Sequence, residues 1–593
     1  MTSLQARNPY VLQGGDVVFR LLVFWSLFLP LGAMWSVDRA LSDSGGGKAP
    51  PKRVFSAGTI AFIAQILIVY WYGVAMKTGA EWKDGTAVYY ALSLDQFATP
   101  FAKALLEYPE LMKILTRTTY WFEIIGPALA IIPIFPQWFR LAGVMGMIGM
   151  HIGFGAGLEL GLFPWISCAG WLAFLPPLFW DRVAVRLLNW RERVVGGRLT
   201  IAYDGGCSFC RRGVHLLRTW LILPNSIVIK GQDDPGYGDI MDVENSWVVG
   251  PNEGEKQTAW KAGALLVRAS PWLFWLAPLA RAFGGVGTWI YRLVEKNRMR
   301  FGRWSRFLLA EKPIRWRLGI VSQVIAAGLI LYVFAWNNGK IKGDDVTIGV
   351  GWASITIPVK KLQPSQKKLG YMLRLDQNWN MFAPRPMRGD GWFVIVGTTR
   401  QKDVINLFGD KPQWEKPAWV KDIYKNQRWR KYLMNLWMAA FKRHRRHYGR
   451  YVCRNWDRDN KANRLDVFHI MYMKEQTTPD GTAPLECVSL WQHWCNGKGK
   501  TVEVKPYEDH CDRLNVRHAI QVAAKKACTC PDSKKPQTCL RISRKHYGKY
   551  EKKLAAAGPI GESLQTEIST AVTAYEGCVV ETTSAAGAQD QSL

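Results

Sequence analysis

Two cysteines three positions apart, Cys207 and Cys210, are the residues whose type and spacing most directly suggest chemistry. They lie after the apolar run 198–204 and before the helix-like run 211–223. At a helix N-terminus, unpaired backbone N–H groups and the helix dipole stabilise a thiolate. The pattern therefore predicts a redox dithiol in which Cys207 attacks a disulfide and Cys210 resolves the mixed disulfide.

Two other interpretations of this cysteine pair remain open, a zinc site and an inert structural pair. A structural zinc site has four ligands, usually completed by a second CxxC motif or a pair of histidines. The surrounding segment 197–305 contains no third cysteine, and His215 is its only histidine. The sequence therefore predicts no metal site and favours the redox dithiol over the structural pair.

The motif YDGGCSFC, which ends at Cys210, resembles the DCC family of thiol–disulfide oxidoreductase-like proteins, named for an Asp-x-x-Cys-x-x-Cys pattern. The matching residues are Asp204, Cys207 and Cys210. A distal aromatic and basic signature of that family is matched by Tyr291, Asn297 and Arg298. The resemblance implies a thioredoxin-like fold for 197–305 and a catalytic role for Asp204 and both cysteines.

Three ionisable residues lie in or beside apolar runs typical of membrane helices. Lys77 follows one run, whereas Glu123 and His151 lie inside two others. Such side chains are costly within a bilayer and therefore mark candidate functional sites. The structural alternatives are a solvated glutamate, a histidine that bonds to a neighbouring helix and a lysine that extends to the interface.

The stretches GGDVVFRLLVFWSLFLPLGAMWSVD and EWKDGTAVYYALSLDQF resemble HTTM proteins, relatives of the vitamin K-dependent γ-carboxylase, over most of residues 8–180. The resemblance implies that Lys77, which precedes Trp82, acts as a base on a quinol. It also implies a quinone-like lipid as the cofactor of a site formed by Lys77, Trp82, Glu123 and His151. HTTM proteins usually have further helices before the GGD segment. Three explanations stay open: the sequence is truncated at its start, the unit has lost those helices, or other membrane subunits supply them and are expected partners.

The elements that must position these residues are six apolar runs, each close to the roughly 20 residues that a spanning helix needs. The runs are 17–35, 54–75, 120–135, 141–158, 162–180 and 318–336. We expect five spans in a membrane unit, residues 1–190, and a sixth transmembrane helix in 314–338.

The net charge of +30 indicates an anionic partner, and the apolar runs favour membrane lipids over nucleic acid. Lys and Arg are enriched on the cytoplasmic side of membrane helices. Arginine-rich stretches flank 197–305 on both sides, so this domain is expected in the cytoplasm. By alternation, residues 339–593 are expected outside, in the periplasm, if the chain lies in a bacterial inner (cytoplasmic) membrane.

The segment after the last apolar run contains an even number of cysteines, on the side where thiols oxidise. They are Cys453, Cys487, Cys495, Cys511, Cys528, Cys530, Cys539 and Cys578. This count allows up to four disulfides, whose pairing the sequence does not determine. We expect a Cys-rich extracytoplasmic domain over 339–580 and, from its composition, a disordered tail over 581–593.

The expected fold class is therefore multidomain. It combines a polytopic α-helical membrane unit of about six spans, an α/β thioredoxin-like domain and a mixed α/β extracytoplasmic domain. The expected function is that of a membrane-anchored thiol–disulfide oxidoreductase acting on a thiol or disulfide protein partner. The alternatives are a non-catalytic subunit of a larger membrane complex and a quinol-dependent, carboxylase-like enzyme built around Lys77.

Overall fold

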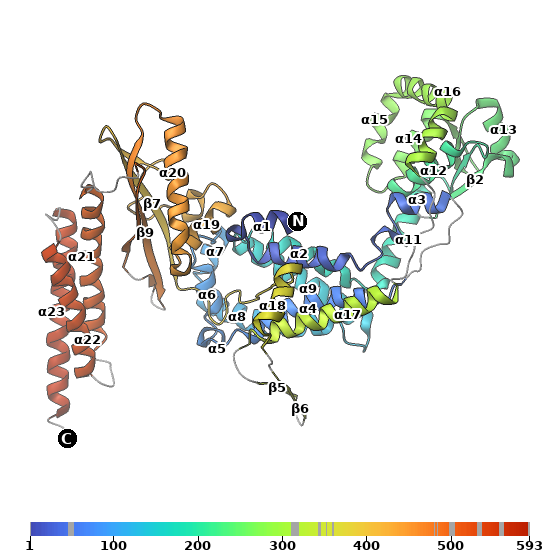
Figure 1. Ribbon diagram of the computed structural model, residues 1–593. Helices are drawn as coiled ribbons and strands as arrows, with labels where there is room; N and C mark the ends of the chain where they lie inside the picture. The colour runs from blue at the N-terminus through green and yellow to red at the C-terminus, as the bar shows by residue number, and fades with distance from the viewer. Residues whose placement is uncertain are drawn as a thin grey trace.

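The computed structural model has three parts, which Figure 1 shows in sequence colours. It describes residues 2–44, 53–223, 225–309, 319–341, 345–350, 353–358, 361–478, 481–482, 484–496, 505–530, 536–556 and 562–590. A helical bundle lies in the middle, an α/β unit lies beyond one end of it, and a β-sheet followed by the C-terminal helices lies beyond the other. The chain is therefore multidomain and of mixed α and β structure.

The central bundle is built from helices whose apolar faces bury large aromatic side chains. Trp25 and Trp171 are fully buried there, and so is Trp379 from the segment that follows the last helix of the bundle. The bundle helices are α2 (Gly14–Ser26), α4 (Ala57–Ala75), α8 (Pro109–Leu129), α9 (Pro136–Gly157), α10 (Phe163–Trp171) and α17 (Ile320–Asn338).

Three helices in the described part of the chain, α4, α9 and α17, are long and apolar enough to cross a membrane. They coincide with three of the six apolar runs in the sequence, 54–75, 141–158 and 318–336. The pair formed by Phe163–Phe174 and α11 (Pro177–Val195) passes the same test together but is bent by 90°. These helices make the chain a membrane protein.

Two of the predicted spans differ from the helices that the structure contains. The run 17–35 is not one helix, because α2 ends at Ser26 and Pro30, which cannot continue a helical hydrogen-bond ladder, follows soon after. The run 120–135 is helical only as far as Leu129, where it forms the second half of α8, and the first half of that helix from Pro109 carries charged residues. Apolar composition marked both segments, but the helix boundaries follow prolines and tertiary packing.

The α/β unit alternates strands and helices as the sequence predicts. Its four-stranded sheet has the order β2-β1-β3-β4, with β1 parallel to β2 and antiparallel to β3. The strands are β1 (Leu199–Tyr203), β2 (Ile227–Lys230), β3 (Val248–Pro251) and β4 (Gln257–Thr258). The helices are α12 (Ser208–Trp220), α13 (Pro235–Glu244), α14 (Ala259–Ala269), α15 (Ala277–Ala282) and α16 (Gly284–Leu308).

The third part is centred on a long antiparallel pair, β7 (Gly389–Thr399) and β9 (Leu465–Thr478), with β8 (Val404–Asn406), β10 (Gly481–Thr482) and β11 (Glu486–Trp494) completing the sheet. The helices α19 (Gln427–Trp437) and α20 (Arg445–Asp459) contribute buried residues to the core of this sheet, and both carry basic and aromatic residues. A separate strand pair is formed by β5 (Asp345–Val350) and β6 (Ala353–Pro358). The mixed α/β composition expected for 339–580 is therefore present.

A helical group, α21 (Lys505–Cys528), α22 (Pro536–Ala556) and α23 (Glu562–Asp590), completes the chain. The last helix extends through most of the tail for which composition predicts disorder, which corrects that expectation for the described part, to Asp590. Its middle turns bury Ile568 and Tyr575 against α21, so packing rather than composition orders the helix.

All eight cysteines after the last span lie in close pairs. They pair as Cys453–Cys495, Cys487–Cys511, Cys528–Cys578 and Cys530–Cys539. Two pairs join the terminal helices to one another or to the turn between them, and Cys487–Cys511 joins α21 to β11. The even cysteine count is thus matched by four disulfides.

Candidate functional site

The dithiol lies where β1 gives way to α12. Cys207 is the N-cap residue of α12, and its Sγ accepts a hydrogen bond of 3.1 Å from the backbone N–H of Cys210. The two residues form a disulfide with a Cα–Cα distance of 5.2 Å. An N-cap sulfur receives both a direct N–H donor and the positive end of the helix dipole, so the Cys207 thiolate is stabilised when the pair is reduced.

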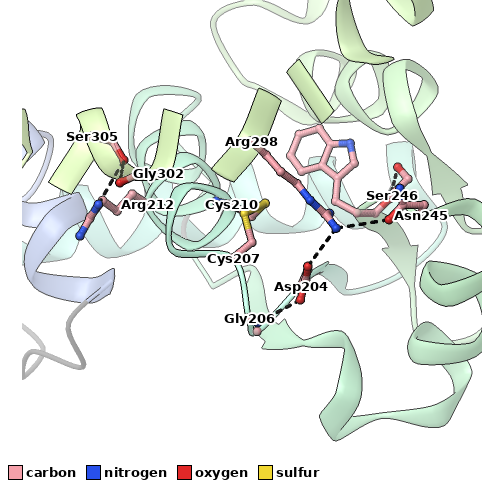
Figure 2. Close-up of a disulfide and its surroundings, with 12 residues drawn as sticks. Asp204, Gly206, Cys207, Cys210, Arg212, Asn245, Ser246, Arg298, Gly302 and Ser305 are labelled. Atoms are coloured by element: carbon pink, nitrogen blue, oxygen red, sulfur yellow. Dashed lines mark hydrogen bonds and ion pairs between the residues drawn. A yellow bond between two sulfur atoms is a disulfide. The ribbon is translucent and has the colours of Figure 1, made fainter. Parts of the chain in front are cut away.

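An ion pair lies beside the disulfide. The Asp204 carboxylate lies 3.4 Å from Arg298 Nη2 and accepts a 2.9 Å hydrogen bond from the Gly206 N–H. Arg298 Nη2 also donates to Asn245 Oδ1 at 3.3 Å. Figure 2 shows the guanidinium reaching from α16 toward Asp204 and Asn245, with the cysteines on its other side. The Asp204 side chain, which the sequence predicts for the site, therefore lies next to the dithiol. It is oriented by Arg298 of α16, a helix that is distant in the sequence.

The C-terminal half of α16 packs against α12. Arg212 donates to Ser305 Oγ at 3.1 Å, and the rings of Phe209 and Phe301 lie 5.7 Å apart. Cys207 is only 2% exposed, whereas Cys210 is half-buried. Cys210 is therefore the more exposed of the two cysteines.

Cys210 also lines a cavity of about 430 Å³ between α12, α14 and α16. Its walls are mostly apolar, and Asp204 and Arg298 lie on its lining. The aromatic and aliphatic lining includes Trp247, Trp260, Tyr291, Leu217, Leu266 and Ile290. None of these wall residues except Tyr291 was singled out from the sequence; the apolar helix-like stretch around 271–298 was the available signal.

The distal signature residues are divided by the structure. The Tyr291 hydroxyl receives hydrogen bonds from Ser246 Oγ at 2.9 Å and from the Trp247 N–H at 3.3 Å, and burial raises the pKa of this phenol. Arg298 reaches the dithiol region, whereas the Asn297 amide bonds to the carbonyl of Leu293 in its own helix. Tyr291 and Arg298 belong to the cavity wall, and Asn297 only supports α16.

The second candidate site gathers three of its four predicted residues. The Lys77 ammonium forms an ion pair with Glu123 and lies 4.4 Å from the centre of the Trp82 ring. Both charged side chains are largely buried. Lys77 and Glu123, which are 46 residues apart in the sequence, are therefore in direct contact. The predicted grouping of Lys77, Trp82 and Glu123 in one site requires this contact.

A segment from beyond the last span closes this second site. The Pro384 carbonyl accepts a 2.8 Å hydrogen bond from the Gly79 N–H, and the Phe382 carbonyl accepts one of 3.1 Å from Trp82 Nε1. Arg388 forms a 2.6 Å ion pair with Glu81. The aromatic–proline cluster after α17 thus packs against the residues that follow the lysine, a role that its sequence did not indicate.

His151 has a different partner. Its Nε2 lies 2.7 Å from the Tyr70 hydroxyl, which also accepts a 2.7 Å hydrogen bond from Trp171 Nε1. His151 is 1% exposed and packs against Phe163. It therefore belongs to a buried polar chain inside the bundle, and its bonding partner is Tyr70 rather than Lys77 or Glu123; neither Tyr70 nor Trp171 stood out in the sequence.

Within the described residues, no group of three or more His, Cys, Asp or Glu side chains is arranged to hold a metal ion. The two sites instead offer a disulfide beside an apolar cavity and a buried amine beside a carboxylate and an indole ring. No family model, no curated protein and no solved structure matches this chain.

Proposed function

We propose that this protein is a membrane-anchored thiol–disulfide oxidoreductase whose reactive group is the Cys207–Cys210 pair. The observation that carries the proposal is the position of Cys207 as N-cap of α12, with its sulfur hydrogen-bonded to the Cys210 N–H. That environment stabilises a thiolate, which is both the attacking and the leaving group in disulfide exchange.

The strand and helix order supports assignment of 197–305 to a thioredoxin-like fold of the DCC type. A strand, the cysteine pair and a helix open the unit, and β3 runs antiparallel to β1. The sheet order β2-β1-β3-β4 places the first strand, and hence the dithiol that follows it, in the interior of the sheet. Such a placement holds reactive groups at the end of a rigid central strand.

The different exposure of the two cysteines supports different roles for them. Because Cys210 is the more exposed residue and lines the cavity, we infer that an incoming thiolate attacks its sulfur and that Cys207 leaves as the stabilised thiolate. This proposed order is the reverse of the one expected from the sequence, in which Cys207 is the nucleophile toward a partner.

The anchoring follows from the helices on either side of the α/β unit. α11 leads into it from the bundle, and α17 follows α16 after the basic stretch that ends the unit. We place 197–305 in the cytoplasm and 339–593 in the periplasm of a bacterial inner membrane. The arginine-rich flanks support the first placement, and the disulfides support the second.

The test is the reduction potential of the pair in the full-length protein, purified in mild detergent and equilibrated across glutathione ratios. The background is Cys168→Ser, since Cys168 is the cysteine outside the disulfides. A reversible two-electron couple between about −270 and −120 mV is expected, because known oxidoreductases span this range. The couple must disappear in Cys207→Ser and in Cys210→Ser. If the wild-type pair cannot be reduced and reoxidised reversibly, the Cys207–Cys210 disulfide has only a structural role.

A second candidate function is a quinol-dependent, carboxylase-like reaction at Lys77. The observation in its favour is the contact of the buried Lys77 amine with Glu123 and with the Trp82 ring. To act as the base that the resemblance to HTTM proteins implies, the Lys77 ammonium must first lose its proton, and the Glu123 carboxylate is in position to accept it. A quinone-like lipid would be the cofactor. Extraction of bound quinone from the wild type, and its loss in Lys77→Met, is the distinguishing measurement.

A further inference from the structure

The cavity beside Cys210 has the size and lining of a small-molecule site. Its volume of about 430 Å³ lies within the range of ligand pockets. Three aromatic side chains contribute flat apolar walls: Trp247, Trp260 and Tyr291. Two helical glycines, Gly213 and Gly263, keep the cavity open: a Cβ at Gly213 would meet nothing within 4 Å, and one at Gly263 only Trp247 at 3.9 Å.

The polar groups of the cavity lie together. Cys210, Asp204 and Arg298 all line it, and Figure 2 places the Arg298 guanidinium between the cysteines and Asn245. A guanidinium carries five N–H donors, and the contacts of Arg298 with Asp204 and Asn245 both use Nη2. The cavity therefore suits a ligand with an apolar ring and a carbonyl oxygen. The aromatic side chains form a flat wall for the ring, Arg298 provides a hydrogen-bond donor for the oxygen, and the Cys210 sulfur lies in the same cavity.

The surface next to the cavity is unusually apolar. The helices α15 and α16 and the turn before them expose Trp272, Phe274, Trp275, Leu279, Phe283, Val286, Trp289 and Leu293, each by half or more. Soluble surfaces rarely carry such a patch, and Trp is enriched where proteins meet a bilayer. Exposed cations on the same helices, Arg281, Arg292, Lys296 and Arg300, suit anionic lipid headgroups.

The apolar patch is continuous with the part of the chain that leaves the bundle. Trp190 of α11 contacts Phe274 with ring centres 5.6 Å apart. In Figure 1, α15 lies on the left edge of the α/β unit, the edge nearer the bundle. The occupant of this patch is therefore the membrane surface, and Ala280 and Ile290 connect the patch to the cavity wall.

We propose that the cavity binds a membrane-soluble quinone, which accepts the electrons of the reduced dithiol. The proposal rests on the proposed function of the same cysteines. The Cys210 thiolate adds to the quinone ring, and the Cys207 thiolate then attacks the Cys210 sulfur and breaks the carbon–sulfur bond. The electron pair stays on the ring. Two thiols and one quinone thus give one disulfide and one quinol, with both protons coming from the thiols.

The test uses the full-length protein in lipid nanodiscs, reduced, freed of reductant and mixed without oxygen with a decyl-substituted ubiquinone. Quinol formation and loss of free thiols are followed together in the Cys168→Ser background. We expect a 1:1 ratio of quinol to disulfide. Gly213→Leu and Gly263→Leu, which fill the cavity from two different helices, should each slow the reaction at least tenfold. Gly548→Leu on α22, where a Cβ also meets open space, is the matched control and should react at the wild-type rate.

The glutathione couple of each variant separates the two proposals. Two results would overturn the quinone proposal while the glutathione couple is intact: the quinone leaves the thiols reduced, or it oxidises the Leu variants as fast as the wild type. In either case the proposed oxidoreductase function would still stand. If the couple itself is absent from the wild type, the proposed function fails first. The rate of each Leu variant is interpreted only if its midpoint of thermal unfolding equals that of the wild type. Titration calorimetry of the quinone with the oxidised wild type measures binding without any variant.

Discussion

At the scale of single residues, the two buried carboxylates with the clearest environments are Glu123 and Asp390. Glu123 is held by a buried cation, whereas Asp390 is held by amide groups. Burying a charge costs free energy that a partner of opposite charge largely offsets, and amides offset less of it. The two carboxylates should therefore respond differently to substitution and to pH.

For the Lys77–Glu123 pair, removing one partner should be far more harmful than removing both. Lys77→Met leaves the Glu123 carboxylate buried without its cation, and we expect a loss of about 3–5 kcal/mol of stability. The double variant Lys77→Met/Glu123→Gln should recover most of that loss. Thermal unfolding in detergent of the two single variants and the double variant measures this; equal losses in all three would show that the ion pair is not coupled.

For Asp390, burial raises the pKa to about 7, and the negative charge of Asp95 adds to the effect. The folded pKa lies above the unfolded value, so the folded state holds a proton that the unfolded state loses near pH 4. Stability from this group is present at low pH and is lost as the pH rises through about 7.

Asp390→Asn removes this titration while the amide oxygen still accepts from Gln96. We therefore expect the midpoint of thermal unfolding of Asp390→Asn, relative to the wild type, to be higher at pH 8 than at pH 5. Scanning calorimetry at both pH values measures the difference. A constant offset between the two proteins would show that Asp390 does not titrate in this range.

At the scale of elements, α16 connects the chemistry of the α/β unit to the last span. Its residues contribute to the cavity wall, to the ion pair with Asp204 and to the packing against α12. A helix of 25 residues that serves all three functions couples their geometry. Shifting α16 should therefore change the accessibility of the first cysteine.

Gly302 lies on the side of α16 that faces the start of α12. A Cβ at this position would lie 3.3 Å from Ser208 Oγ, so Gly302→Leu should push the two helices apart. In the Cys210→Ser background, we expect iodoacetamide to alkylate Cys207 at least fivefold faster in the Gly302→Leu variant than in the protein that keeps Gly302. Gly285→Leu on the same helix, where a Cβ meets nothing within 4 Å, is the control. Equal alkylation rates in all three proteins would show that α16 does not shield Cys207.

At the scale of the whole molecule, the α/β unit and the disulfide-bonded sheet lie beyond opposite ends of the helical bundle (Figure 1). The segment that follows α17 nevertheless packs into the bundle, because Trp379 is buried there and Gln377 Oε1 accepts a 2.9 Å hydrogen bond from Gln65. We expect the two end units to contact different aqueous compartments, as the arginine-rich flanks of the α/β unit predict.

Single cysteines on exposed positions test this topology. With Cys168, Cys207 and Cys210 replaced by serine, Asp239→Cys on α13 and Lys461→Cys after α20 each provide one free thiol. A membrane-impermeant maleimide should label only Lys461→Cys in right-side-out vesicles and only Asp239→Cys in inverted ones. Labelling of both from the same side would place the two units in one compartment.

The sequence by itself determined the elements whose signal is local. The strand before Cys207, the helix after it and the spans α4, α9 and α17 follow from apolar runs and from the dithiol spacing. The even number of cysteines after the last apolar run likewise allowed four disulfides, but it did not determine the partners. Each of these signals is contained in a few neighbouring residues, so no long-range contact is needed to read it.

Only the tertiary structure decided which residues share a site. Lys77 meets Glu123 and not His151, Arg298 reaches from α16 to Asp204, and the end of α16 packs against α12. The apolar cavity exists because three helices far apart in sequence leave space around two glycines. Burial and mutual distance are properties of packing between distant segments, and one-dimensional patterns of hydropathy and charge do not contain them.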